Sequence, residues 1–214
     1  MILEALVPDC NYLLSSGRHS NTSALLCNLT HKQLKLNRTV TIVHHFGESS
    51  VHHYDTLLAK SGVNVSEVKE SGKLKYSELN CLLHTPPHLD NNSDNPEWLK
   101  KVEENQVVVL TEIHLLLGLG CQLKDVVMLV QRLLRDGLIV IVTSRDSPET
   151  KQLNTYLESL LGNCVSVDTL NSGASKEVDG HMTRRSTGVV STGLYKGSER
   201  GLKVFPLGTA PGTV

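Results

Sequence analysis

The sequence is poor in aromatic residues and has almost no excess charge of either sign. Aromatic side chains make up 4% of the 214 residues, with two Phe and one Trp among them. Interfaces usually rely on Trp, Tyr and Arg anchors, so we expect any partner surface here to be built from Leu and Val patches with Arg. The formal net charge of −1 gives no global attraction for nucleic acid. An RNA contact would therefore need a local cluster of Lys and Arg.

Long apolar runs are missing as well. No run approaches the roughly 18 residues that a membrane-spanning helix needs, and MILEALVPDC lacks the basic start and long apolar centre of a secretory signal. We therefore expect no membrane partner and a location in the cytoplasm or the nucleus. With 39% hydrophobic and 20% charged residues, a single domain covering 1–214 with a well-filled core is expected.

Paired metal ligands are also lacking. The five cysteines occur singly, without a C-x-x-C pair, which argues against a zinc site and against a disulfide framework. We interpret them as small buried hydrophobic residues: Cys10, Cys27, Cys81, Cys121 and Cys164. His44 with His45 and His52 with His53 lie at an expected strand end and helix start, but adjacent residues point to different faces. For these histidines we predict partner contact or solvent exposure, and we expect no metal and no other cofactor.

Short β-like runs alternate with segments of helical period, which is typical of βα units stacked into a mostly parallel sheet. Strands are expected near 11–15, 39–44, 106–111 and 138–143. VVVL and LIVIV, within the last two, are continuous apolar runs, as in strands buried on both faces. The sequence therefore predicts an α/β fold with these two strands in the middle of the sheet.

Amphipathic helices are expected between the strands. Two apolar faces follow helical spacing: Leu25, Leu26, Leu29 and Leu36, and Leu123, Val126, Val127, Val130 and Leu134. The clearest helix is 148–161, with Ser147 as its cap, Pro148 at its first position and Gly162 at its end. Another helix covers 50–61.

The sequence pattern changes towards the C-terminal end. From 163 onwards, short β-like segments separated by Gly and Ser predict an antiparallel extension of the sheet. The polar stretch 84–97, rich in Pro and Asn, is the predicted long loop. Trp98 begins an amphipathic stretch directly after it and is expected to anchor a packed helix rather than to stack on a base.

LLSSGRHSNTSALL, 13–26, has the order of a phosphate-binding loop but not its chemistry. In G-x-x-x-x-G-K-[ST], backbone N–H groups wrap the phosphates, the Lys neutralises them and the hydroxyl ligates magnesium. Aligned from Gly17, the second Gly is replaced by Thr22, the Lys by Ser23 and the hydroxyl by Ala24. This degenerate loop predicts that no nucleotide is held tightly, while weak anion binding at the helix N-terminus stays open.

Acidic residues that could help to bind magnesium or activate a water molecule are poorly placed. In an active phosphate-loop enzyme, an Asp directly after the third strand holds the water bound to magnesium. Here Thr111 takes that place, and the acidic residue Glu112 follows one position later. Glu48 follows the second strand and could activate water, but a capping or solvated role is the better interpretation. We therefore predict that the chain has no catalytic residues and does not hydrolyse ATP.

Six segments together resemble the Elongator complex protein 6 family. They are SGRHSNTSALL, SVHHYDTLLAKSGV, VVVLTEIHLLLGLG, LIVIVTSRDS, EVDGHMTRR and GLKVFPLGTAPGTV, and their order spans the whole chain. The resemblance implies a RecA-like fold, related to phosphate-loop NTPases, without working nucleotide-binding motifs. It also implies a subunit of a hexameric ring with Elongator subunits four and five, which works with the other Elongator subunits. In that ring tRNA is bound and released during wobble uridine modification.

Three arginines are the best candidates for RNA contact. Arg145 follows the fourth expected strand, and Arg184 and Arg185 lie in HMTRRSTG, where loops bearing Gly and Ser at strand ends could present them to phosphate. Surface charge without a ligand is the simpler alternative. Lys196 and Arg200 are weaker candidates in an expected hairpin turn.

Two other functions stay open. An active nucleotide hydrolase with an atypical loop would depend on Glu112 or Glu48. A protein-interaction adaptor would occupy the same ring without touching RNA. The sequence does not decide between them, and it gives neither the ring order nor the faces used for assembly.

Overall fold

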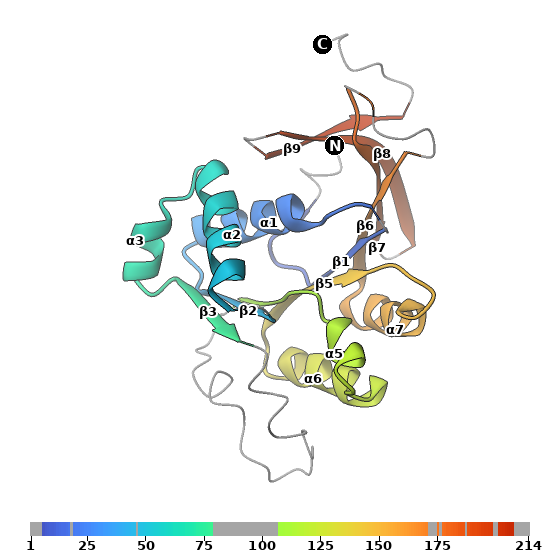
Figure 1. The fold of residues 1–214 in the computed structure, drawn as a ribbon, viewed down its shortest axis with the longest axis horizontal. Coiled ribbons are helices and arrows are strands. Elements are labelled where there is room, and N and C mark those ends of the chain that lie inside the picture. Colours follow the sequence, from blue (N-terminus) through green and yellow to red (C-terminus); the bar gives the residue numbers. More distant parts are fainter. Residues whose placement is uncertain are drawn as a thin grey trace.

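The computed structural model describes residues 6–17, 19–45, 47–78, 107–170, 175, 177–186, 188–198 and 201–207. Within these ranges the chain forms one nine-stranded sheet, in the order β3-β2-β4-β5-β1-β6-β7-β8-β9, with helices on both faces (Figure 1). The α/β fold class predicted from the sequence is confirmed. The predicted loop 84–97 and Trp98 lie outside the described residues.

Six neighbouring strands pair in parallel. They are β1 (Tyr12–Ser16), β2 (Val40–His44), β3 (Leu74–Glu78), β4 (Val107–Leu110), β5 (Ile139–Arg145) and β6 (Asn163–Thr169). The apolar runs of β4 and β5 are buried along most of their length, because helices cover both faces of this part of the sheet. These two strands form the centre of the parallel part, although the antiparallel extension makes β1, rather than the predicted β4 and β5, the middle strand of the whole sheet.

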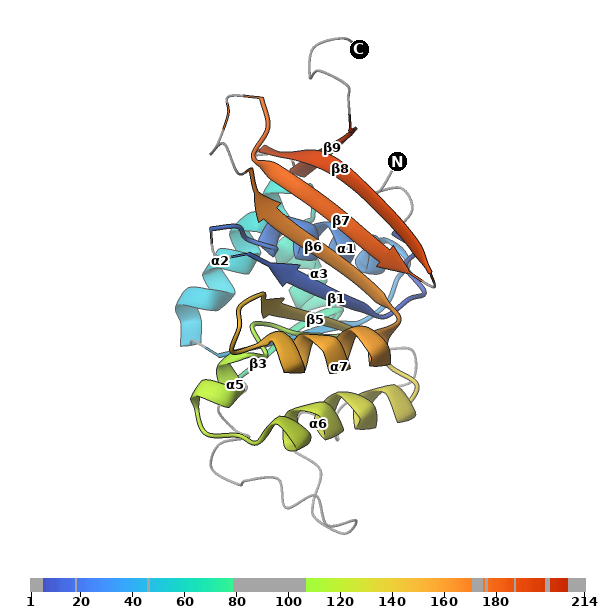
Figure 2. The same cartoon turned by 90° about the vertical axis from the view of Figure 1, so that its right-hand side faces the viewer.

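Three antiparallel strands extend the sheet beyond β6. These are β7 (Gly180–Ser186), β8 (Val189–Ser198) and β9 (Gly201–Pro206), which form a long ribbon at one side of the molecule (Figure 2). The antiparallel extension is confirmed, but its predicted start at 163 is wrong. β6 still pairs in parallel with β1, because α7 provides the crossover that returns the chain in the same direction.

The helices divide between the two faces of the sheet (Figures 1 and 2). One face carries α1 (Ser23–Lys35), α2 (Gly47–Lys60) and α3 (Val65–Glu70). The opposite face carries α5 (Leu115–Gly118), α6 (Leu123–Arg135) and α7 (Lys151–Leu161). No described helix is long and apolar enough to cross a bilayer.

The predicted helix 148–161 begins later than expected. Thr150 is the N-cap of α7, and its hydroxyl donates to the carbonyl of Arg145 at 2.6 Å. Ser147 and Pro148 therefore lie in the preceding turn. Gly162 ends the helix with a φ of 72°, a left-handed conformation that glycine adopts without steric cost. The predicted helix 50–61 is confirmed within α2, although α2 starts three residues earlier.

Each face of the sheet packs its own apolar core. Consecutive residues of a strand point to opposite faces, so Leu14 packs with α1 and α2 while Leu13 packs with α6 and α7. Cys27 and Cys164 are buried in these cores, and burial raises the pKa of the Cys27 thiol to about 12 and that of Cys164 to about 11. These two cysteines are therefore protonated packing residues, as the sequence predicts, whereas Cys10 and Cys121 are only half-buried.

Candidate functional site

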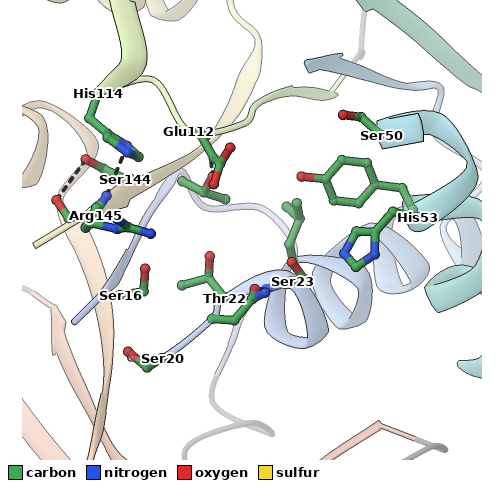
Figure 3. A pocket seen from close by; sticks show the side chains of 14 residues that line it. Ser16, Ser20, Thr22, Ser23, Ser50, His53, Glu112, His114, Ser144 and Arg145 are labelled. Carbon is green, nitrogen blue, oxygen red and sulfur yellow. Dashed lines mark hydrogen bonds between the residues drawn. The ribbon is translucent and has the colours of Figure 1, made fainter. Parts of the chain in front are cut away.

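The carboxyl ends of β1, β4 and β5 open into a cavity of about 410 Å³ beside the first turns of α1 and α2. This is where ligands bind in open parallel sheets, because the loops that leave the strands diverge there. Hydroxyl and imidazole groups dominate its wall (Figure 3). The lining residues are Ser16, Ser20, Asn21, Thr22, Ser23, Leu26, Ser50, His53, Tyr54, Glu112, His114, Thr143, Ser144 and Arg145.

The loop between β1 and α1 is tied to β6. The N–H of Gly17 and the hydroxyl of Ser20 both donate to the carbonyl of Val167, at 3.0 and 2.8 Å. A Cβ on Gly17 would lie 2.2 Å from the Oδ1 of Asp168. Glycine at the start of the loop therefore leaves room for the Asp168 carboxylate, which would have to turn away from any larger residue.

The first turn of α1 forms one wall of the cavity. Thr22 is the N-cap, but its side chain makes no capping hydrogen bond, and its hydroxyl points into the cavity (Figure 3). The N–H of Ser23 donates to the Oδ1 of Asn21 at 2.6 Å. Ser23 lines the cavity where a phosphate-binding loop would place its lysine, and Ala24 does not line it. The first turn of α1 therefore keeps the place of the phosphate-loop lysine at the cavity wall, but Ser23 puts a hydroxyl there instead of a positive charge.

Glu112 reaches the cavity from the end of β4 in an unusual backbone conformation. Its φ of 48° lies in the left-handed region, which side chains other than glycine, Asn and Asp rarely adopt. The N–H of Glu112 donates to the Oγ1 of Thr143 on β5 at 2.7 Å, and this bond holds the strained peptide. The carboxylate is consequently directed into the cavity (Figure 3). Glu48, the other acidic candidate, lies in the first turn of α2.

His114 and Arg145 form the wall between β4 and β5. The Nδ1 of His114 accepts from the backbone N–H of Arg145 at 3.2 Å, so the neutral ring carries its proton on Nε2. Burial, together with the nearby positive charge of Arg145 and with His45, lowers the pKa of His114 to about 4. At neutral pH this imidazole is therefore an uncharged hydrogen-bond donor.

The four histidines do not converge. His44 and His45 are 3% and 5% exposed, and burial lowers the pKa of both. The prediction of partner contact or solvent exposure is therefore wrong for these two, because they close the buried end of β2. His53 lines the cavity and His52 is exposed. Among the described residues, no group of three or more His, Cys, Asp or Glu side chains could hold a metal ion.

Two of the three candidate arginines, Arg184 and Arg185, lie on opposite faces of the sheet. Arg184 and Arg185 lie within β7 rather than in a loop, opposite Val165 and Cys164 of β6. Those two β6 residues belong to the two different cores, so the arginine side chains leave opposite faces of the sheet. Arg145 is exposed at the cavity wall, and Arg185 lies 4.0 Å from Glu158.

Lys196 and Arg200 are the two weaker candidates for RNA contact, and the structure describes only Lys196. Lys196 lies in β8, opposite Lys203, and its Nζ donates to Asp179 at 2.7 Å. The predicted hairpin is confirmed, since β8 and β9 pair antiparallel with Ser198 opposite Gly201, but Lys196 lies in the strand before the turn and its charge is paired with Asp179. Arg200 lies outside the described residues.

A second hollow of about 300 Å³ lies beside the first, on the other side of Gly17. Its polar lining consists of Asp146, Asp168, His181 and Arg185 together with Ser166, Thr169 and Thr183. Two carboxylates, of Asp146 and Asp168, face the single guanidinium of Arg185 in this hollow. Arg185 therefore contributes to a different concave surface from Arg145.

Sequence reasoning missed several cavity residues, notably Ser16, Ser50, His114 and Ser144. A usable signal exists for some of them, because polar residues follow each apolar strand run directly: SS ends β1, TEIH follows β4, and TSR ends β5. Carboxyl ends of neighbouring parallel strands meet at one edge of a sheet. His53 and Ser50 could be found only once the position of α2 was known.

Solved structures share this fold at low sequence identity. A KaiC-like protein from the hyperthermophilic archaeon Pyrococcus horikoshii matches with a TM-score of 0.62 at 13% identity, over 92% of this chain and 90% of its own. The flagellar accessory protein FlaH from Methanocaldococcus jannaschii matches with a TM-score of 0.60 at 16% identity, over 91% and 88%. No family model matches the chain, and the comparison with curated proteins gives no match. The chain therefore has a RecA/KaiC-like fold.

Proposed function

We propose that the chain is a non-catalytic subunit of the Elongator accessory ring, assembled with Elongator subunits four and five. The observation that carries the proposal is the cavity wall at α1, where Ser23 stands in the position of the phosphate-loop lysine. A RecA-like domain needs that cation, a magnesium-binding hydroxyl and an acidic metal partner for phosphoryl transfer. A domain with these groups replaced retains its shape for assembly.

Support for the particular ring comes from the sequence resemblance, whose six segments follow the order of the Elongator complex protein 6 family. Subunits of RecA-like rings pack side by side, and an edge that has lost its chemistry can persist as an interface. The role in tRNA binding and release follows from the same resemblance. We assign this chain a share of a basic surface rather than a complete RNA site, because Arg145, Arg184 and Arg185 do not converge.

Co-expression tests the proposal. We expect the chain, Elongator subunits four and five to elute together and to give the mass of two heterotrimers in native mass spectrometry. Omission of this chain should prevent the hexamer from forming. A chain that stays monomeric in the presence of both partners would contradict the proposal.

An active nucleotide hydrolase is the second candidate function, and Glu112 favours it. Strained backbone conformations are concentrated at functional sites, and this one directs a carboxylate into the cavity. That function predicts saturable ATP turnover by the purified chain, abolished in Glu112→Gln. Absence of turnover in the wild-type chain removes this candidate.

An adaptor that never contacts RNA is the third candidate, and tRNA retention distinguishes it. We would compare rings carrying the wild-type chain with rings carrying Arg145→Ala, Arg184→Ala and Arg185→Ala together. Phosphate contacts should weaken steeply with salt, so the comparison is made at two salt concentrations. Equal tRNA retention by both rings would establish the adaptor.

A further inference from the structure

One face of the antiparallel ribbon is left without a covering helix. On the side of the sheet that carries α5, α6 and α7, no described helix lies over β7, β8 or β9 (Figure 2). The opposite face of the ribbon is closed, because α1 packs there and Tyr195 and Val204 belong to the core beneath it. We call the uncovered side the open face of the ribbon. A sheet usually buries its apolar face against a second layer, so the residues of the open face show whether such a layer is missing.

The open face carries apolar side chains in its middle. Consecutive residues of a strand point to opposite faces, so Leu194 and Phe205, which neighbour the buried Tyr195 and Val204, point to the open face. They lie directly opposite each other on β8 and β9, and neither packs in the two cores. Val190 shares this face and is 64% exposed. A solvated face of an antiparallel sheet normally carries polar residues, so this face is suited to burial against another surface.

The two sides of the open face carry opposite charges. On the β6 side, the hollow of about 300 Å³ holds the exposed carboxylates of Asp146 and Asp168. The one guanidinium in that hollow, Arg185, also approaches Glu158 to 4.0 Å. On the β9 side, Lys203 is exposed and forms no ion pair with the described carboxylates. Negative charge is therefore in excess on one side of the open face and positive charge on the other.

A second copy of the same chain complements this pattern. A two-fold axis that lies between two copies and runs along their strands places the β6 side of one copy against the β9 side of the other. Each copy then brings Lys203 to the side where the other carries Asp146 and Asp168, and the hollow beside β6 gives the lysine room to enter. Sheets packed face to face are about 10 Å apart, which lysine and aspartate side chains can span together. The apolar residues of β8 and β9 lie between the charged sides and are covered.

We propose that the open face of the ribbon is a self-association surface, through which two copies of this chain pack sheet against sheet. A face that carries both a charge and its complement favours a second copy, because one pairing then satisfies both sides at once. The proposal goes beyond the ring function and does not depend on it, since it concerns the chain without Elongator subunits. A ribbon of three strands is small for an interface, so we expect a weak dimer with a Kd of roughly 10 µM.

Sedimentation velocity of the purified full chain, measured over a range of concentrations, tests the proposal. We expect the average mass to rise from one copy to two as the concentration passes the Kd. Leu194→Asp should remain monomeric at every concentration, because the dimer would bury a carboxylate from each copy near its centre. Circular dichroism checks that this variant is folded. A wild-type chain that stays monomeric far above the expected Kd would overturn the proposal.

Two neighbouring valines provide a matched pair of variants. Val189 and Val190 are 62% and 64% exposed, and because they are adjacent in β8 they point to opposite faces of the ribbon. Val190→Asp should raise the Kd of the dimer about tenfold, because the new carboxylate loses water at the interface. Val189→Asp makes the same chemical change on the other face and should leave the Kd unchanged. Equal effects of the two substitutions would show that the copies meet through another surface.

Exchange of the two charges tests the two-fold arrangement itself. Asp168→Lys and Lys203→Asp should each raise the Kd about tenfold, because two symmetry-related contacts change from attraction to repulsion. The double variant should recover most of the wild-type affinity, since each pair is restored with its signs exchanged. A double variant no better than the single ones would contradict this arrangement.

Hydrogen exchange separates a second copy from a different partner. If the chain alone is monomeric and β8 and β9 become protected only when Elongator subunits four and five are added, the open face belongs to those partners and self-association is overturned. The co-expression experiment described above reports separately on the proposed function, because ring assembly does not require a dimer of this chain alone.

Discussion

The interior of the parallel sheet and the edge where its strands end differ in what they demand of the sequence. Within the strands, apolar residues such as Ile141 and Val109 are fully buried between two layers of helices. Towards their carboxyl ends, β1 and β5 present Ser16, Thr143 and Arg145 to a cavity. The interior determines the fold, whereas the edge determines what the fold can do, and substitutions in the two regions should therefore have separable effects.

The largest effect is expected in the interior. Ile141→Ala removes a fully buried side chain from β5 and should lower the free energy of unfolding by about 2–5 kcal/mol. Urea unfolding followed by circular dichroism measures this. Val190→Ala, at a residue that is 64% exposed on β8, is the control and should change stability by less than about 0.5 kcal/mol. Equal losses in the two variants would show that the interior is not the main source of stability.

A smaller loss is expected at Gly17, where the cavity edge meets β6. Gly17→Ala would place a Cβ against the carboxylate of Asp168 and should cost about 0.5–1.5 kcal/mol in unfolding free energy, because the exposed carboxylate has to leave its present rotamer. The double variant Gly17→Ala with Asp168→Ala should recover part of that loss, because the two residues are in contact. Strict additivity of the two single changes would mean that close approach to Asp168 is not the reason for glycine here.

Relief of backbone strain should give a gain rather than a loss. Glu112→Gly replaces a residue at a φ of 48°, and we expect stability to rise by roughly 0.5–1 kcal/mol, since the left-handed region costs most residues about 1–2 kcal/mol and glycine loses some of this in chain entropy. Asn37→Gly, at a φ of 63°, should gain less, because Asn visits this region more readily. A loss of stability in Glu112→Gly would show that the carboxylate makes contacts that outweigh the strain.

The smallest effect concerns pH. The pKa of His114 is lowered from 6.5 to about 4, so the unfolded chain binds a proton more readily than the folded chain between these values. The contribution of the uncharged His114 side chain to the stability of the folded chain is therefore present above pH 6.5 and declines as the pH falls towards 4. His44 and His45, whose pKa values are also lowered by burial, act in the same direction.

Unfolding measured at several pH values checks this. His114→Asn should reduce the slope of stability against pH in the window between about pH 4 and 6.5. His52→Asn, at an exposed position in α2, is the matched control for replacing a histidine by asparagine. An unchanged slope in His114→Asn would indicate that its ring is protonated as readily in the folded chain as in the unfolded chain.

The fold could be predicted because its signals are local and repeated. Continuous apolar runs specify buried parallel strands, and the run LIVIV with the preceding helical stripe leaves little choice of topology. The error at 163–169 has a physical reason as well. A strand that pairs in parallel on one side and antiparallel on the other carries no sequence mark of this difference.

The cavity could be predicted only in part. Thr22 and Ser23 were found through the spacing of a known loop, and Glu112 and Arg145 through their place after apolar runs. The partnership of His114 with Arg145, the strain at Glu112 and the separation of Arg184 from Arg185 depend on strand register and on backbone conformation. None of these follows from composition or spacing, because a shift of one residue along a strand reverses the face that a side chain occupies.

The most direct test of the central claim is the affinity of the purified chain for ATP with and without magnesium, measured together with turnover. If the cavity has lost its cation and metal groups, ATP should bind equally well under both conditions and no phosphate should be released. Binding that tightens tenfold or more with magnesium, accompanied by turnover that disappears in Glu112→Gln, would contradict it.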